Sequence, residues 1–77
     1  MSPWLWPPSE KPLTITPREL QVLVGASEGH TNVMIGHDLG ISEQTVKNHI
    51  TRINQRLGTQ DRTTAVVYAI RAGWIRL

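Results

Sequence analysis

The sequence predicts an all-α domain of four short helices behind an extended N-terminal tail. Four capping residues each precede a run with helical spacing of apolar residues, and each of these runs ends before a glycine. No stretch alternates apolar and polar residues for long enough to indicate a strand. Four of the five prolines fall in the first 12 residues, where they prevent a regular helix or strand.

The first two helices are each expected to start at a threonine. Thr16 opens a capping box that Glu19 completes, and a proline occupies the first helical position between them. Apolar residues follow at helical spacing until Gly29 closes the segment. Thr31 caps the second, shorter helix, which Gly40 ends.

The third helix is expected over about 43–57, between a Ser42 cap and Gly58. It carries one clean apolar stripe, made by Val46, Ile50, Ile53 and Leu57. The fourth helix runs from an Asp61 cap to about Ala72.

Helices two and three are joined by the four residues Leu39-Gly40-Ile41-Ser42. A connection this short makes the two helices cross steeply. Gly40 supplies the left-handed backbone that ends the second helix. This spacing indicates a helix-turn-helix.

Length and composition exclude several classes of protein. A chain of 77 residues makes one thin-cored domain, and with no cysteine it has no disulfide, thiolate zinc site or cysteine nucleophile. No apolar run approaches the roughly 20 residues that span a bilayer, and the first residues do not form a signal peptide. We therefore expect a cytoplasmic protein without a membrane partner.

Charge is divided unevenly along the chain. Residues 1–42 carry two basic and four acidic side chains, whereas residues 43–77 carry six basic and two acidic ones. A basic C-terminal half favours an anionic partner, of which nucleic acid is the commonest.

Six sequence segments occur in an order that is typical of one protein family: LTITPRELQVL, EGHTN, LGISEQTVKNHI, RLG, DRTTAV and AIRAGWI. Together, residues 13–77 resemble the DNA-binding domain of the LuxR/GerE/FixJ family of bacterial transcription regulators. The resemblance implies a third helix in the DNA major groove and, as in many members, a dimer through the fourth helix. The chain departs from the family pattern at Met34, often charged, and at Gly36, usually alanine. The sensor or receiver domain that members usually carry is expected to be absent.

The face of the third helix opposite its apolar stripe suits DNA. At about 100° per residue, that face is polar and uncharged at its centre and basic at its edge. Base edges offer neutral donors and acceptors, while phosphates attract cations. We expect base contacts from Lys47, Asn48, Thr51 and Gln44, the first three of which occupy base-reading positions in the family.

Phosphate contacts are expected from six residues: Thr31, Asn32, Thr45, His49, Arg52 and Arg56. Thr31 and Asn32 begin a helix, where backbone N–H groups meet anions. For His49 a structural hydrogen bond is the alternative. Arg62 either joins these contacts or braces Asp61 or the preceding loop.

Metal binding and catalysis are not expected. His30, His37 and His49 are spaced by seven and twelve residues, which does not form a ligand pair such as i, i+4. No nucleophile–base pair, phosphate-binding loop or carboxylate pair is present, so neither a cofactor nor an enzymatic activity is assigned.

Residues 65–70 are apolar without a break, which is more apolar surface than one core contact buries. The resemblance implies that a second copy covers the excess, with Val67 central to an interface of Val67, Tyr68, Ile70 and Arg71. The alternative to a second copy is that this apolar surface is covered within the chain, by Trp74 or by Trp4 and Trp6 of the tail (residues 1–12).

Two functions follow from these patterns. The first is a sequence-specific, double-stranded DNA-binding transcription regulator that acts as a homodimer. The second is a small helix-turn-helix module that recruits or sequesters a protein, such as another regulator or RNA polymerase. The salt dependence of the binding affinity distinguishes the two functions, because DNA binding weakens steeply with rising salt and apolar docking does not.

Overall fold

The computed structural model describes residues 13–76, and within this range it contains four helices and no strand. They are α1 (Pro17–Ser27), α2 (Asn32–Leu39), α3 (Glu43–Leu57) and α4 (Arg62–Arg71). The all-α prediction is confirmed, with the third helix at its expected bounds. The predictions made for residues 1–12 lie outside the described residues.

Each helix begins at its predicted capping residue. The Thr16 hydroxyl accepts a hydrogen bond from the Glu19 amide at 3.1 Å, and the Glu19 carboxylate accepts one from the Thr16 amide at 2.9 Å. The Ser42 hydroxyl accepts from the Thr45 amide at 3.0 Å in the same way. Each such bond satisfies an amide that has no partner within its helix and contributes roughly 1 kcal/mol.

The cap of α4 is a carboxylate. The Thr64 amide donates to Asp61 Oδ1 at 2.7 Å, and this bond holds the pKa of Asp61 below its usual range. Because the folded-state pKa is lowered, the bond's stabilisation is fully present above the ordinary carboxyl pKa. It is lost only as the pH falls through the lowered value, so α4 keeps its cap at neutral pH.

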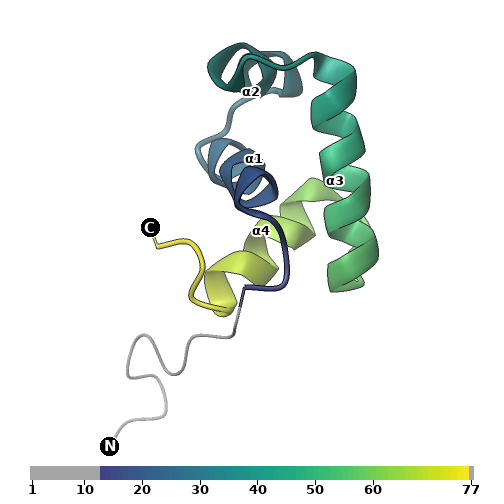
Figure 1. The fold of residues 1–77 in the computed structure, drawn as a ribbon. Coiled ribbons are helices and arrows are strands. Elements are labelled where there is room, and N and C mark those ends of the chain that lie inside the picture. Colours follow the sequence, from purple (N-terminus) through teal and green to yellow (C-terminus); the bar gives the residue numbers. More distant parts are fainter. Residues whose placement is uncertain (1–12, 77) are drawn as a thin grey trace, which may run out of the picture.

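Helix α1 lies at the centre and contacts the other three helices, while α3 packs against both α2 and α4 (Figure 1). One core joins all four helices and the segments that flank them. Its buried members are Ile15, Val22, Leu23, Ile35, Val46, Ile53, Ala65, Ala69 and Ile75. The apolar stripe predicted for α3 supplies two of them, so the opposite face of that helix is turned toward solvent.

The turn between α2 and α3 is held by two glycines. Gly40 has a φ of 71°, in the left-handed region that ends α2. The Ile41 amide donates to the Gly36 carbonyl at 2.9 Å. A Cβ added to Gly36 would lie 2.6 Å from the Ile41 carbonyl oxygen, so the missing side chain lets the turn lie directly against α2.

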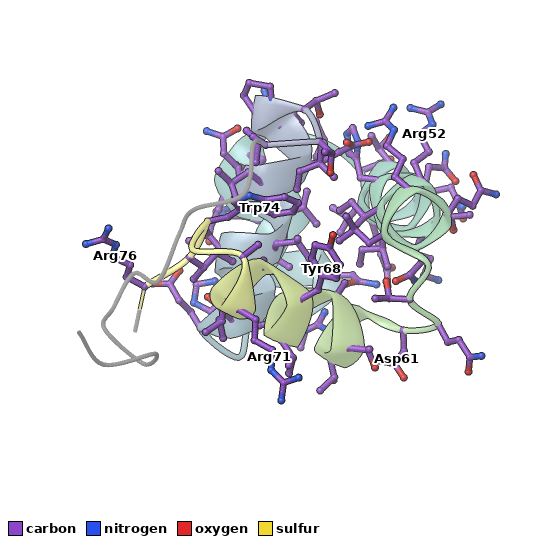
Figure 2. All side chains as sticks on the ribbon, turned by 90° about the horizontal axis from the view of Figure 1, so that it is seen from below. Arg52, Asp61, Tyr68, Arg71, Trp74 and Arg76 are labelled. Atoms are coloured by element: carbon purple, nitrogen blue, oxygen red, sulfur yellow. The ribbon has the colours of Figure 1, made fainter. Side chains whose placement is uncertain are left out.

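The outer surface of α4 is covered only in part from within the described chain. The Trp74 ring lies 5.5 Å from the Tyr68 ring, centroid to centroid, at a tilt of 50° (Figure 2). Trp74 therefore packs against one of the apolar side chains of α4, Tyr68. Val67 nevertheless remains 41% exposed.

We expect Gly40→Ala to destabilise the domain by about 1–2 kcal/mol, because a Cβ is strained in the left-handed region. Gly40→Asn is the matched control and should lose less, since asparagine tolerates this conformation. Urea unfolding followed by circular dichroism measures both. An alanine variant as stable as the parent would show that the turn does not need the left-handed residue.

Candidate nucleic-acid interface

The polar face of α3 is exposed along its length. Val46 and Ile53 are fully buried. The side chains on the opposite face are all exposed: Gln44, Lys47, Asn48, Thr51, Arg52 and Gln55. Arg52 projects outward from the helix (Figure 2). The structure therefore brings the four expected base contacts onto one open surface, with basic side chains beside neutral ones.

Two hydrogen bonds order the first turns of this face. Gln44 Nε2 donates to Asn48 Oδ1 at 3.1 Å, which holds two amide side chains together. Thr51 Oγ1 donates to the Lys47 carbonyl at 3.0 Å. The Thr51 proton is thereby engaged by its own helix, which leaves its methyl group and an acceptor lone pair available.

The starts of α2 and α3 carry exposed hydroxyl caps. Thr31 Oγ1 accepts from the Met34 amide at 3.2 Å, so its own proton remains available to a phosphate oxygen. Thr45 shares a hydrogen bond of 2.9 Å between its hydroxyl and that of Ser42. Both threonines therefore stand beside free backbone amides of a helix N-terminus.

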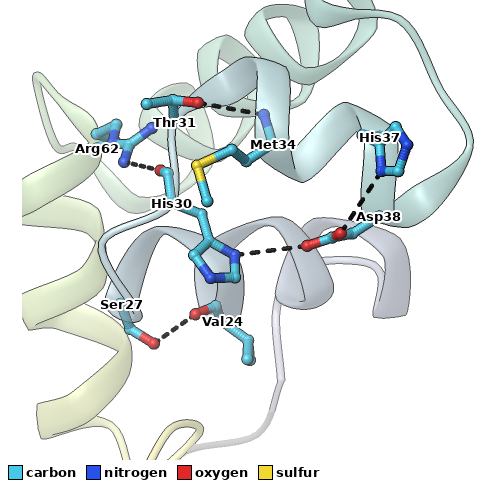
Figure 3. Close-up of polar contacts among 8 residues, drawn as sticks. All are labelled: Val24, Ser27, His30, Thr31, Met34, His37, Asp38 and Arg62. Atoms are coloured by element: carbon cyan, nitrogen blue, oxygen red, sulfur yellow. Dashed lines mark hydrogen bonds and ion pairs between the residues drawn. The ribbon is translucent and has the colours of Figure 1, made fainter.

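Arg62 has a role that the sequence did not predict. Its Nη1 donates to Asn32 Oδ1 at 2.8 Å, and its Nη2 donates to the His30 carbonyl (Figure 3). It therefore joins the start of α4 to the start of α2, and neither bond goes to Asp61 or to the loop before it. Asn32 keeps its amide nitrogen as a donor, because only its oxygen is engaged.

The expected phosphate contact Arg56 has an internal partner. Its Nη1 lies 2.5 Å from Glu19 Oε1, and Glu19 is only 2% exposed. The same carboxylate oxygen accepts the Thr16 amide. The pair joins the first turn of α1 to the last turn of α3. The sequence predicts only the capping role of Glu19, because nothing local marks a partner 37 residues away.

His49 lies half-buried on the flank of α3. Its Nδ1 is buried and has no hydrogen-bond partner within residues 13–76. A structural hydrogen bond through this nitrogen is therefore not found in the described part of the chain.

Neither a metal cluster nor a membrane span occurs in the described range. No group of three or more histidine, aspartate or glutamate side chains in residues 13–76 gathers closely enough to hold a metal. None of the helices in that range has the length and apolar character that crossing a bilayer requires.

A steep helix-turn-helix whose second helix exposes a polar, basic-edged face is the structure of a DNA-binding domain. Residues 13–69 match the family model described as bacterial regulatory proteins, luxR family, and the chain belongs to that family. It is a LuxR-type helix-turn-helix DNA-binding domain of transcription regulators, as the sequence resemblance implied. The family is one of regulatory proteins, which agrees with the absence of an assigned enzymatic activity.

Two relatives are each 50% identical to this chain. One is the transcriptional regulatory protein DegU of Brevibacillus brevis, matched over 87% of this chain and 29% of its own length. The other is the transcriptional regulatory protein LiaR of Bacillus subtilis, matched over 75% of this chain and 28% of its own length. The chain therefore spans less than a third of the length of these relatives.

Solved structures show the same fold. The transcription factor GerE superimposes with a TM-score of 0.80 at 31% identity, over 84% of this chain and 97% of its own. The response regulator ChrA of a heme-sensing two-component system superimposes with a TM-score of 0.77 at 32% identity, over 86% of this chain and 33% of its own.

We expect Arg56→Met to destabilise the domain by about 2 kcal/mol, because it leaves the buried Glu19 carboxylate without its cation. This is less than the roughly 3–5 kcal/mol of a fully buried pair, since Arg56 is partly exposed. Adding Glu19→Gln should recover part of the loss. Arg52→Met, at an exposed position of the same helix, is the control and should change stability little.

Urea unfolding of the parent, the two single variants and the double variant gives the coupling energy of the pair. Additive losses would contradict the account, because they would mean that the two side chains stabilise the fold independently.

Proposed function

We propose that this domain recognises a specific double-stranded DNA sequence by inserting α3 into the major groove, and that it does so as a homodimer. The observation that carries the proposal is the open face of α3, where neutral donors and acceptors stand beside basic side chains. A rigid cap and a glycine turn hold the first residues of this helix, which usually make the base contacts.

Four side chains of α3 are assigned to bases. Lys47 donates to guanine O6 or N7, and Asn48 pairs with N6 and N7 of adenine. Thr51 contacts a thymine methyl group with its own methyl, because its hydroxyl proton is engaged within the helix. Gln44 releases Asn48 on binding and contacts the neighbouring base.

The surrounding polar groups are assigned to phosphates: Thr31, Asn32, Thr45, His49 and Arg52. They supply affinity without sequence information. Arg56 has a side chain that is 45% exposed, and only Nη1 is bound to Glu19. Its remaining N–H groups therefore still serve a phosphate while the ion pair fixes the helix.

Dimerisation is assigned to the outer face of α4. Val67 is exposed at the centre of this face, Tyr68 and Ile70 are half-buried beside it, and Arg71 is exposed at its edge. A two-fold dimer through this face presents two copies of α3 to a palindromic site. As a bacterial regulator that binds chromosomal DNA, the protein acts in the cytoplasm.

We expect Lys47→Ala and Asn48→Ala each to reduce the preference for the target over a scrambled duplex by about 1–3 kcal/mol, because each removes a base contact. Gln21→Ala, exposed on α1, is the control. Equilibrium binding to both duplexes at one fixed salt concentration measures the preference. An unchanged preference in both α3 variants would show that this face does not read bases.

We expect Val67→Glu to change the stoichiometry on a palindromic duplex from two chains to one, because the interface would bury an unpaired charge. Val24→Glu is a matched control, since Val24 is 39% exposed and Val67 41%. Sedimentation of the protein–DNA complex measures the stoichiometry. Two chains on the duplex with the Val67 variant would exclude α4 as the interface.

The alternative function is recruitment or sequestration of a protein by a helix-turn-helix module. The salt dependence of the binding affinity distinguishes it from DNA recognition. Setting Arg52 and Arg56 of each chain against phosphates releases counterions, so DNA binding weakens with rising salt, whereas apolar docking onto a protein changes little.

A further inference from the structure

Helices α1 and α2 leave an open, apolar groove between them that has no part in the DNA-binding surface. Its volume is about 330 Å³, and its lining comes only from α1, α2 and the loop that joins them. Val24 stands at its mouth, 39% exposed. Gly25 also lines the groove and lets Ile35 of α2 approach α1 closely, because a Cβ there would lie 2.8 Å from Ile35 Cγ1. No residue of α3 and none of the proposed phosphate contacts lines this groove.

Two carboxylates border the same groove, and both lie at the C-terminal end of a helix. Glu28 is the C-cap residue of α1, whose last turn contains no basic residue, and Asp38 lies in the last turn of α2. A helix C-terminus carries partial negative charge, so a carboxylate there is unfavourable and a cation is favourable. The groove thus joins apolar walls to two sources of negative potential.

The side chains near these carboxylates compensate them only in part. Asp38 lies 3.5 Å from His30 Nδ1 and 4.0 Å from His37 Nδ1 (Figure 3). Glu28 takes part in no ion pair within residues 13–76. Arg18 reaches the Leu39 carbonyl at 3.4 Å, at the C-terminal end of α2. The Glu28 end of the groove remains without a cation of the described chain.

We propose that this groove is a docking site for a protein segment that presents one bulky apolar side chain next to an arginine or lysine. A volume of about 330 Å³ is at the lower limit of small-molecule sites and suits a single anchoring side chain. The carboxylates and helix ends attract a flanking cation and repel nucleic-acid phosphates. Since the groove and α3 share no residue, the domain binds DNA and this partner at the same time.

The probe is a 14-residue amphipathic peptide with leucines on one face and arginines beside them. Two control peptides are compared with it. One has glutamate in place of arginine, and the other has serine in place of leucine. Titration of the full chain by amide NMR should place the shifts of the first peptide on α1 and α2. Both comparison peptides should bind at least about tenfold more weakly, a loss of roughly 1.4 kcal/mol.

Variants of the full chain locate the site. Val24→Ser and Glu28→Gln should each weaken binding of the leucine–arginine peptide by about fivefold, which corresponds to roughly 1 kcal/mol. Val67→Ser and Glu43→Gln are the matched controls on α4 and α3 and should leave it unchanged. DNA binding should be unchanged in Val24→Ser and Glu28→Gln, so failure here is distinct from failure of the proposed function.

Three results would overturn the proposal. If the glutamate peptide bound as tightly as the leucine–arginine peptide, the carboxylates of the groove would have no role in attracting a cation. A loss with Val67→Ser equal to that with Val24→Ser would move the site to α4. Binding at least about tenfold tighter in a Trp4→Ala, Trp6→Ala variant would assign the groove to the chain's own first residues, which contain one lysine and no arginine.

Discussion

The ion pair between Glu19 and Arg56 fastens the C-terminal end of α3 to α1, and this end-point constrains how the helix with the polar face is held. One nearly buried carboxylate completes the cap of α1 and also receives the guanidinium from the last turn of α3. A buried charge is tolerable only when it is fully partnered, so α1 and the C-terminal end of α3 are held at one separation. The Gly36–Gly40 turn fixes the other end of α3 against α2. With both ends of α3 held in this way, its apolar stripe faces the core and its polar face is exposed to solvent.

The helices were predictable from the sequence because their signals are local. Thr16, Thr31, Ser42 and Asp61 each sit within three residues of the amide they cap, and a glycine follows each helix within two residues of its end. The exposed face of α3 was predictable for the same reason, since one apolar stripe determines it.

The contacts between helices were not predictable, because they join residues far apart in sequence. Arg62 reaches His30 and Asn32 some 30 residues away, and no local pattern records that choice. The close approach of Ile41 to Gly36 likewise depends on how the turn folds back on α2. The groove between α1 and α2 was not predictable either, because the close approach of Ile35 to Gly25 that shapes it exists only once α2 is in place.

We propose that α3 reads a specific DNA sequence and that two copies do so together. Selection of bound duplexes from a random DNA pool at moderate salt tests both parts at once. We expect an enriched motif with two-fold symmetry, whose half-sites are one helical turn apart. A pool that stays random after repeated selection, although the protein is folded and binds DNA, would contradict it.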